Sequence, residues 1–304
     1  MSAEPTTSSP FALTDHMEVE TMPEIRPPSL EAVVAFYDNT TAMEILMGQN
    51  IHLGCWPEND GDMSLAEAQD RLTDLVAAQC DLHPRARLLD VGCGTGAPAR
   101  RLARTTGVSV TGVTLSPRQM EVATARSLQE GLEAFTEFRV ADAAALPFAD
   151  EEFDAAIAIE SILHMPEKSR ALGEIFRVLR PGAALVIADL TQTPEAVAAS
   201  TEAVASVLSL AAAPTEDGYR ELADRAGFHV EGVLDLGPQI QASYTQLIQR
   251  LAAHRAELTA ATNAEQAGAI EEVLRLYGAA TVEGTAGYIL LTARKPAIRR
   301  RPEG

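Results

Sequence analysis

The sequence predicts an α/β fold with a doubly wound, mostly parallel sheet and a helical cap. From residue 87 onward, short apolar runs alternate with helical patterns. The first of these runs leads into a glycine-rich loop, DVGCGTGA at 90–97, which opens a helix. After about residue 190 the alternation gives way to long helical stretches that interrupt the last strands. Alternating strands and helices form parallel sheets covered on both faces, and right-handed crossovers make such sheets doubly wound.

Apolar runs mark the strands of this sheet. They are rich in Val, Ile, Leu and Ala and are bounded by turn residues, as is typical of strands buried on both faces. A helix followed by a strand is expected within 217–236, and a final strand at 286–295. The expected strands of the alternating part are residues 87–92, 108–116, 135–142, 153–161 and 183–190.

Capping residues mark the helices. Ser64 and Glu67 form a capping-box pattern, and Ser116 with Gln119 forms a second one whose helix is ended by Gly131. Apolar residues at helical spacing support the remaining assignments. The expected helices lie within 29–47, 64–80, 97–107, 117–131, 167–179, 194–213, 242–258 and 264–280.

Composition shifts divide the chain. Residues 1–28 are rich in Ser, Thr, Pro and acidic residues, which predicts a mobile tail. Helices at 29–83 and insertions at about 191–215 and 239–278 are expected to cap the carboxyl ends of the strands, where ligands bind in open α/β sheets. The main α/β domain spans 84–295, and 296–304 is a basic tail that we interpret as solvated.

Charge and cysteine content exclude several classes of protein. The formal net charge is -19, which disfavours nucleic acid as a partner. The sequence contains no apolar run of membrane-spanning length and no signal-peptide pattern. Its 3 cysteines have neither zinc spacing nor the density of a disulfide scaffold. We therefore expect a reduced, cytoplasmic protein without a metal site.

The glycine loop is compatible with two kinds of cofactor. Gly92, Gly94 and Ala97 satisfy the dinucleotide pattern G-x-G-x-x-G/A, so a nicotinamide-dependent oxidoreductase is one hypothesis. That pattern also requires an acid about twenty residues further on, to hold a ribose. The corresponding segment, GVTLS, offers Thr114 and Ser116 instead. The missing acid weakens the dinucleotide interpretation.

Several motifs in register resemble class I S-adenosylmethionine-dependent methyltransferases. LLDVGCGTG resembles their D-x-G-x-G-x-G loop, and GVTLSPRQ, VADAAALPF, IESILHM and RVLRPGAALVIAD resemble the segments that follow, together covering about residues 85–190. Upstream, residues 36–56 resemble the opening of sterol C-methyltransferases and of related bacterial natural-product O- and C-methyltransferases of the rebeccamycin sugar, rifamycin and teleocidin types. The resemblance implies a Rossmann-like sheet that binds S-adenosylmethionine and releases S-adenosylhomocysteine.

The same resemblance implies a role for individual residues. Asp90, the acid at the end of the first strand, would accept hydrogen bonds from the methionyl ammonium or from loop amides. The glycines would let the cofactor come close to the backbone. The ends of the second and third strands would contact its ribose and adenine. Glu160 faces the cofactor pocket and Tyr37 closes over it. The implied cofactor-binding residues are Tyr37, Asp90, Gly92, Gly94, Gly96, Thr114, Gln119, Asp142, Ala143 and Glu160.

A structural role is the alternative for most of these side chains. Asp90 would cap the glycine loop, Gln119 would close its capping box, and Asp142 would be a solvated loop acid. Glu160 would be a partly buried structural carboxylate, and Tyr37 a core residue with a satisfied hydroxyl. His52, in the upstream segment, is open to a role in a cofactor lid or in loop packing.

His164 is the sharpest candidate for chemistry. It follows the fourth strand at the carboxyl edge of the sheet, and a neutral imidazole can accept a proton near pH 7. Asp189, at the end of the fifth strand, would orient this imidazole or stabilise its charged form, as the resemblance to the rebeccamycin enzyme also implies. The pair slightly favours O-methylation over C-methylation. The structural alternative is that His164 caps a helix and Asp189 caps the end of a strand.

Cap residues indicate the kind of acceptor. The apolar residues of the cap predict that the methyl acceptor is a small or medium, fairly hydrophobic secondary metabolite. The cap sequence has no cluster of basic residues that would bind a diphosphate group. C-methylation of a prenyl or alkene group and a non-methylating cyclisation on the same fold are the alternatives. The position of the N-terminal segment also suggests a homo-oligomer. The candidate acceptor residues are Met43, Met47, Trp56, Leu208, Ile240, Tyr244 and Leu247.

Overall fold

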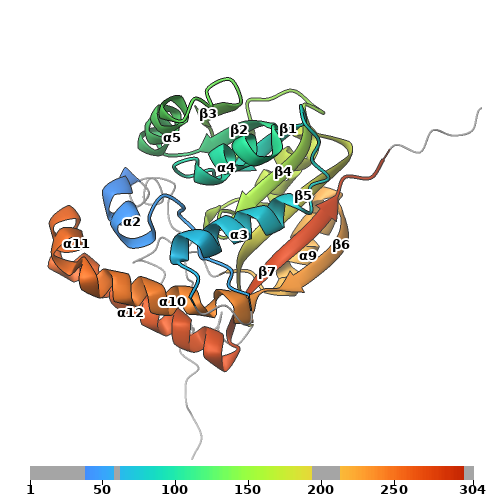
Figure 1. Ribbon diagram of the computed structural model, residues 1–304. Helices are drawn as coiled ribbons and strands as arrows, with labels where there is room; N and C mark the ends of the chain where they lie inside the picture. Colours follow the sequence, from blue (N-terminus) through green and yellow to red (C-terminus); the bar gives the residue numbers. More distant parts are fainter. Residues whose placement is uncertain (1–37, 58–61, 194–212, 298–304) are drawn as a thin grey trace, which may run out of the picture.

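A computed structural model describes residues 38–57, 62–193 and 213–297 (Figure 1). The expected tail at 1–28, Tyr37, most of the cap stretch at 194–213 and most of the basic tail lie outside the described residues. No helix in the described part of the chain is long and apolar enough to cross a membrane.

The strands form one 7-stranded sheet in the order β3-β2-β1-β4-β5-β7-β6. The strands from β1 to β5 pair in parallel, and β7 runs antiparallel to both of its neighbours. This confirms the predicted doubly wound, mostly parallel sheet. The strands are β1 (Arg87–Val91), β2 (Ser109–Thr114), β3 (Thr136–Val140), β4 (Phe153–Ile159), β5 (Leu179–Gln192), β6 (His229–Asp235) and β7 (Ala286–Arg294).

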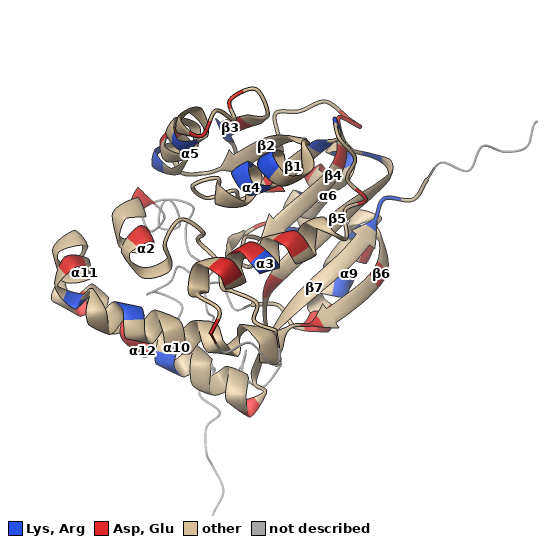
Figure 2. Cartoon of the chain, in the orientation of Figure 1, with Lys and Arg blue, Asp and Glu red and all other residues tan. Residues whose placement is uncertain are grey.

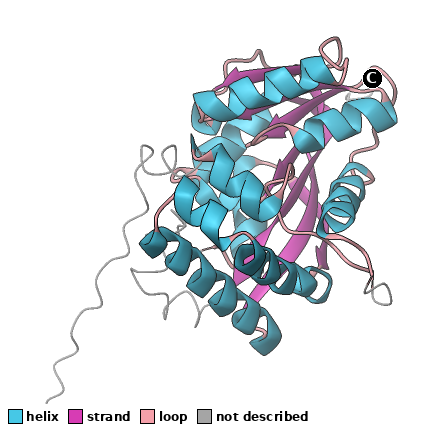
Figure 3. Ribbon diagram, turned by 60° about the vertical axis from the view of Figure 1, so that its left-hand side comes forward, coloured by secondary structure: helices cyan, strands magenta, loops and turns pink. Residues whose placement is uncertain are grey.

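Both faces of the sheet are buried under helices (Figure 3). Successive strand residues belong to different hydrophobic clusters: Leu88 packs in one, and Leu89 in the other. The helices on the Leu88 face are α3 (Leu65–Ala77), α4 (Ala97–Thr106) and α5 (Pro117–Gln129). The opposite face is covered by α6 (Lys168–Val178) and α9 (Glu216–Ala226).

The cap is built from α2 (Thr40–Met47) and three helices between β6 and β7, namely α10 (Gly237–Ala253), α11 (Arg255–Ala261) and α12 (Ala264–Glu283). The hydrogen bond from Arg250 Nε to Ile45 O (2.6 Å) ties α2 to α10, and that from Asn39 Nδ2 to Ala261 O (3.0 Å) ties it to α11. In Figure 1 these four helices lie together at one end of the sheet.

Some predicted boundaries were wrong for local reasons. The helix predicted at 242–258 breaks at His254, which ends α10 and starts α11 with φ -111° and ψ 23°; the apolar pattern continues through this break and hides it. Strand β5 starts at Leu179 instead of residue 183, because Leu179 already pairs with Phe153. The α3 helix ends at Ala77, short of residue 80.

Charged residues lie mostly on the outer surfaces of the helices (Figure 2). The acidic side of α3 meets the basic side of α4, where Arg101 pairs with Asp70 (2.5 Å) and Asp74 (2.7 Å). These ions are partly exposed, so each pair contributes about 0–1 kcal/mol. The stability of the fold therefore rests mainly on the two apolar clusters.

Gly112 in β2 links this core to the glycine loop. A Cβ at this position would meet Cys93 Sγ and the Phe138 ring, each at 2.8 Å. The absence of a side chain at Gly112 lets Cys93, inside the loop, pack flat against the sheet. The position of the loop therefore depends on a small residue in the neighbouring strand.

We predict that Gly112→Ala lowers the free energy of unfolding by about 1–3 kcal/mol, because it overpacks the core. Gly232→Ala is the matched control: Gly232 lies in a strand at the edge of the sheet, and a Cβ there meets nothing within 4 Å. Urea unfolding of both variants checks the prediction. Equal midpoints for the two variants would contradict it.

Candidate active site

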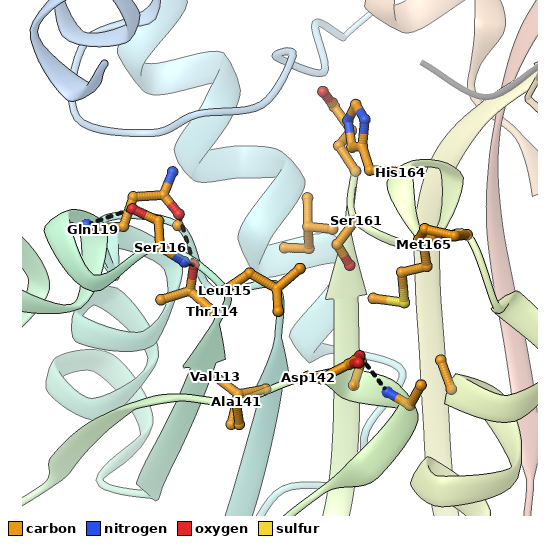
Figure 4. A pocket seen from close by; sticks show the side chains of 18 of the residues that line it. Val113, Thr114, Leu115, Ser116, Gln119, Ala141, Asp142, Ser161, His164 and Met165 are labelled. Carbon is orange, nitrogen blue, oxygen red and sulfur yellow. Dashed lines mark hydrogen bonds between the residues drawn. The ribbon is translucent and has the colours of Figure 1, made fainter. Parts of the chain in front are cut away.

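Two adjoining cavities lie where the parallel strands end at their carboxyl edge. The larger cavity has a volume of about 370 Å³, and the smaller, apolar cavity about 130 Å³. Ile51, Glu160 and His164 line both of them. The larger cavity is bordered by the glycine loop, the end of β2, residues 141–144 and the turn after β4 (Figure 4). These are the segments from which the sequence predicted a cofactor site.

The glycines of the loop serve different needs. All three have positive φ, at 79° for Gly92, 54° for Gly94 and 73° for Gly96, a region that L-residues with side chains rarely adopt. A Cβ on Gly92 would lie 2.4 Å from Ser161 Cβ, and one on Gly96 would lie 2.6 Å from the Phe138 ring. A Cβ on Gly94 would meet only Ile51 Cδ1, at 3.8 Å. Gly92 and Gly96 thus permit packing, whereas Gly94 keeps space open in the cavity.

Asp90 is a buried acid beside this loop. Its side chain is 2% exposed, and Oδ2 has no hydrogen-bond partner among the described residues. Burial raises its pKa to about 7. Asp90 borders a space of about 20 Å³ together with Gly92 and Gly94. An unpaired buried carboxyl is costly, so this oxygen fits a donor supplied by a bound ligand.

Thr114 and Gln119 lie at the end of β2 and are joined to each other. Thr114 Oγ1 donates to Gln119 Oε1 (2.8 Å) and accepts from the Ser116 backbone N–H (3.2 Å). Ser116 Oγ caps α5 by accepting from Gln119 N (3.0 Å) and donates to the Asp38 carboxylate of the N-terminal segment. The predicted capping box is therefore only half formed, because the Gln119 side chain pairs with Thr114 instead.

Asp142 and Ala143 follow β3 and line the same cavity; Figure 4 shows Asp142 there. Asp142 Oδ1 accepts from Ala144 N (2.8 Å) and so caps the short 3-10 helix η1 (Ala143–Ala145). The acid is thereby held in one orientation, unlike a freely solvated loop residue.

His164 ends the 3-10 turn η2 (Ile162–His164), directly after β4. Asp189 lies under this turn: Oδ2 accepts from Leu163 N (3.0 Å), and Oδ1 accepts from Leu190 N (3.1 Å). The carboxyl of Asp189 is fully buried, which raises its pKa to about 7. The sequence-predicted pair thus occupies adjoining strand ends, and Asp189 holds the backbone that carries the imidazole.

Glu160 occupies the junction of the two cavities. Its backbone is left-handed, with φ 46°, which is uncommon for a non-glycine residue and is often found at functional sites. Oε1 accepts from Leu53 N (2.7 Å) and from Tyr288 Oη (3.0 Å). Burial is the largest effect on its carboxyl and raises the pKa to about 8. Glu160 thereby connects β4, β7 and the N-terminal segment.

The N-terminal segment is fixed by α3. Gln69 Nε2 lies 2.9 Å from Asn50 O and 2.8 Å from His52 O. His52 is buried, with Nδ1 2.8 Å from Leu53 O, and burial lowers its pKa to about 4. Loop packing is therefore the role of His52 that the contacts support. The packed segment places Ile51 and the Leu53 N–H at the site.

The apolar cavity is lined mainly by the cap. Among the predicted acceptor residues, Met43, Met47, Tyr244 and Leu247 line it, whereas Trp56 and Ile240 pack in the core, and Leu208 lies outside the described residues. No lysine or arginine is among the described residues that line this cavity. The other lining residues are Leu46, Ile51, Leu53, Glu160, Leu163, His164, Leu190, Ile270, Val273, Leu274 and Tyr277.

Several residues of the site were missed by sequence reasoning. Ile51 and Ser161 line the larger cavity, and the Tyr288 hydroxyl holds Glu160. Ser161 had a local signal, since it directly follows Glu160, whereas its contact with Gly92 is visible only in the structure. Tyr288 had none, because it lies 128 residues from its partner. Across the residues that the structure describes, no group of His, Cys, Asp or Glu could hold a metal ion.

Methyltransferases and a cyclase are among the known proteins that this chain resembles in sequence and structure. A family described as "Methyltransferase domain" matches residues 89–187. The chain is 36% identical to 27-O-demethylrifamycin SV methyltransferase of Amycolatopsis mediterranei, over 84% of this chain and 93% of the relative. It is 31% identical to (+)-O-methylkolavelool synthase of Herpetosiphon aurantiacus, over 90% and 97%. The solved structure of the [4+2]-cyclase SpnF is similar with a TM-score of 0.78 and 34% identity, over 90% and 98%.

We predict that Glu160 makes stability depend on pH. Unfolded, its carboxyl ionises near its ordinary pKa of 4.5; folded, it keeps its proton to about pH 8. Between these values the unfolded state binds fewer protons, so the contribution of Glu160 to stability falls as pH rises. Glu160→Gln should therefore gain stability relative to the wild type from pH 5 to pH 8, by about 2–4 kcal/mol.

Urea unfolding at several pH values measures this difference. Glu133→Gln is the control, because Glu133 is exposed and lines neither cavity; it should follow the wild-type profile. Parallel stability profiles for Glu160→Gln and the wild type would refute the assignment of a raised pKa to Glu160.

Proposed function

Because this chain belongs to the class I S-adenosylmethionine-dependent methyltransferases, we propose that it methylates a hydroxyl group of a small or medium, apolar secondary metabolite. Its cofactor is S-adenosylmethionine, and S-adenosylhomocysteine is the product. The observation that carries the proposal is the position of His164, which lines both the larger cavity and the apolar cavity. A base at that junction reaches a molecule in either cavity.

The residues of the larger cavity fit the cofactor. The unpaired Oδ2 of Asp90 is suited to an ammonium group, and Gly94 leaves the adjoining space free. Thr114 and Gln119 offer polar atoms for ribose hydroxyls, and Asp142 with the Ala143 backbone is suited to adenine. When bound, S-adenosylmethionine supplies a methyl group that is bonded to a sulfonium sulfur, which is a good leaving group. The chain contributes binding, orientation and exclusion of water.

His164 acts as the general base in this proposal. An alcohol oxygen must lose its proton as it gains a carbon substituent, and a neutral imidazole accepts that proton near pH 7. Asp189 acts as a positioning residue, because its carboxyl binds the Leu163 N–H within the turn that ends in His164. The proton therefore moves to a side chain whose backbone is anchored to β5.

The relatives favour oxygen as the methylated atom. The names of 27-O-demethylrifamycin SV methyltransferase and (+)-O-methylkolavelool synthase both describe O-methylation. The absence of lysine and arginine from the described lining of the apolar cavity supports an uncharged acceptor over a prenyl diphosphate. C-methylation of an alkene remains an alternative, because it too requires a proton acceptor.

A cyclisation without methyl transfer is the second candidate. It is favoured by the similarity to the [4+2]-cyclase SpnF, which is 34% identical and covers 90% of this chain. Such an activity would convert a polyunsaturated substrate without forming S-adenosylhomocysteine. Mass spectrometry of the reaction mixture separates the two candidates.

We predict that His164→Ala retains S-adenosylmethionine binding but lowers turnover at least about 100-fold, the usual contribution of a general base. Turnover is measured as S-adenosylhomocysteine release with a panel of hydroxylated natural products that includes 27-O-demethylrifamycin SV. The control is His83→Ala, which removes an exposed histidine before β1. Full activity of His164→Ala would exclude its role as the base.

A further inference from the structure

Tyr244 carries an unsatisfied hydroxyl in the apolar cavity. Its side chain comes from α10 and is only 5% exposed, and it lines that cavity beside Leu247. The hydroxyl oxygen has no hydrogen-bond partner among the described residues. The Thr281 hydroxyl is near enough to lower the pKa of Tyr244, against the effect of burial, but it forms no bond to Tyr244 Oη within 3.5 Å and donates its own proton to Tyr277 O at 2.8 Å. Tyr244 therefore differs from the tyrosine that faces it on α12, Tyr277, whose hydroxyl accepts from Gln192 Nε2 at 3.4 Å.

An unpaired buried hydroxyl costs about 1–3 kcal/mol. Native proteins keep few such groups, and each calls for an explanation. Burial and the nearby Glu160 carboxyl raise the pKa of Tyr244 well above its ordinary value, so the phenol stays neutral and can both donate and accept. A phenylalanine would fill the same space without this cost. The hydroxyl thus has a use that the described contacts do not account for.

The shape of the cavity limits what can reach this hydroxyl. Its volume is about 130 Å³, and apolar cavities of about 150 Å³ bind benzene. One ring, or a branched hydrocarbon group of similar size, therefore fits. The lining offers aliphatic and methionine side chains to such a group, with Glu160 and His164 at its border with the larger cavity.

We propose that Tyr244 selects the acceptor: its hydroxyl forms a hydrogen bond with a neutral hydroxyl or carbonyl oxygen on a ring-sized, otherwise apolar part of the molecule. This proposal rests on the proposed function, because it treats the apolar cavity as the place where the acceptor binds. The acceptor would then be an uncharged molecule that places one polar atom among the apolar side chains of this cavity.

The test compares two probes that differ by one hydroxyl group, 4-fluorophenol and fluorobenzene. Their affinities are measured by ¹⁹F NMR titration of the full-length protein saturated with S-adenosylhomocysteine. The preference is the ratio of the affinity for 4-fluorophenol to the affinity for fluorobenzene. Because Tyr244→Phe removes one hydrogen bond, this ratio should fall about five- to tenfold in that variant. Tyr277→Phe, which removes a hydroxyl from the same lining, should keep the wild-type preference.

The proposal is overturned if the preference is unchanged in Tyr244→Phe, if it falls equally in Tyr277→Phe, or if the wild type binds neither probe. A melting temperature of Tyr244→Phe at or above that of the wild type, without ligand, is expected because an unpaired hydroxyl is lost. Binding of S-adenosylhomocysteine is measured by calorimetry on the same samples. A wild-type protein that does not bind S-adenosylhomocysteine would contradict the proposed function. The ratio of the probe affinities tests the role of Tyr244 separately.

Discussion

The glycine loop after β1 is the constraint on which the site depends. Three positive φ values turn the chain from the sheet into α4 within a few residues, and two of the glycines touch Ser161 and Phe138 so closely that no side chain would fit. Packing against Ser161 sets the distance between the loop and the end of β4. The residues after β4 include Glu160 and His164, so the loop geometry also places the proposed chemistry. Gly94, in contrast, contributes empty space to the larger cavity.

Glu160 joins this edge of the sheet to the cap. Its carboxyl receives the Leu53 N–H from the N-terminal segment and the Tyr288 hydroxyl from β7, which returns from the cap helices. A neutral acid can hold two such donors in a buried place at lower desolvation cost than a carboxylate. The two cavities therefore meet at a residue that is fixed from three directions.

Local patterns predicted most of the fold, and several residues of the predicted cofactor site line one cavity in the structure. The alternation of apolar runs and helices, with the loop from Asp90 to Gly96, was sufficient for the parallel strands, and the family resemblance supplied Thr114, Asp142 and His164. The missing parts depend on contacts between distant segments. No periodicity connects Tyr288 with Glu160, and the break at His254 lies inside an unbroken apolar pattern. The capping box predicted for Ser116 and Gln119 was wrong in one half, because the Gln119 side chain binds Thr114 and not the backbone at Ser116.

The central claim is that Gly94 keeps open the space that S-adenosylmethionine occupies, and calorimetry of Gly94→Val tests it most directly. Gly107→Val is the matched control, since Gly107 has a similar positive φ of 73° and a Cβ there meets nothing within 4 Å, at the end of α4. Both variants carry backbone strain, about 1–2 kcal/mol, but only one fills the cavity. We predict that Gly94→Val weakens S-adenosylmethionine binding at least about 100-fold, a loss of about 2.7 kcal/mol, while Gly107→Val binds like the wild type. An unchanged dissociation constant in Gly94→Val would contradict the account.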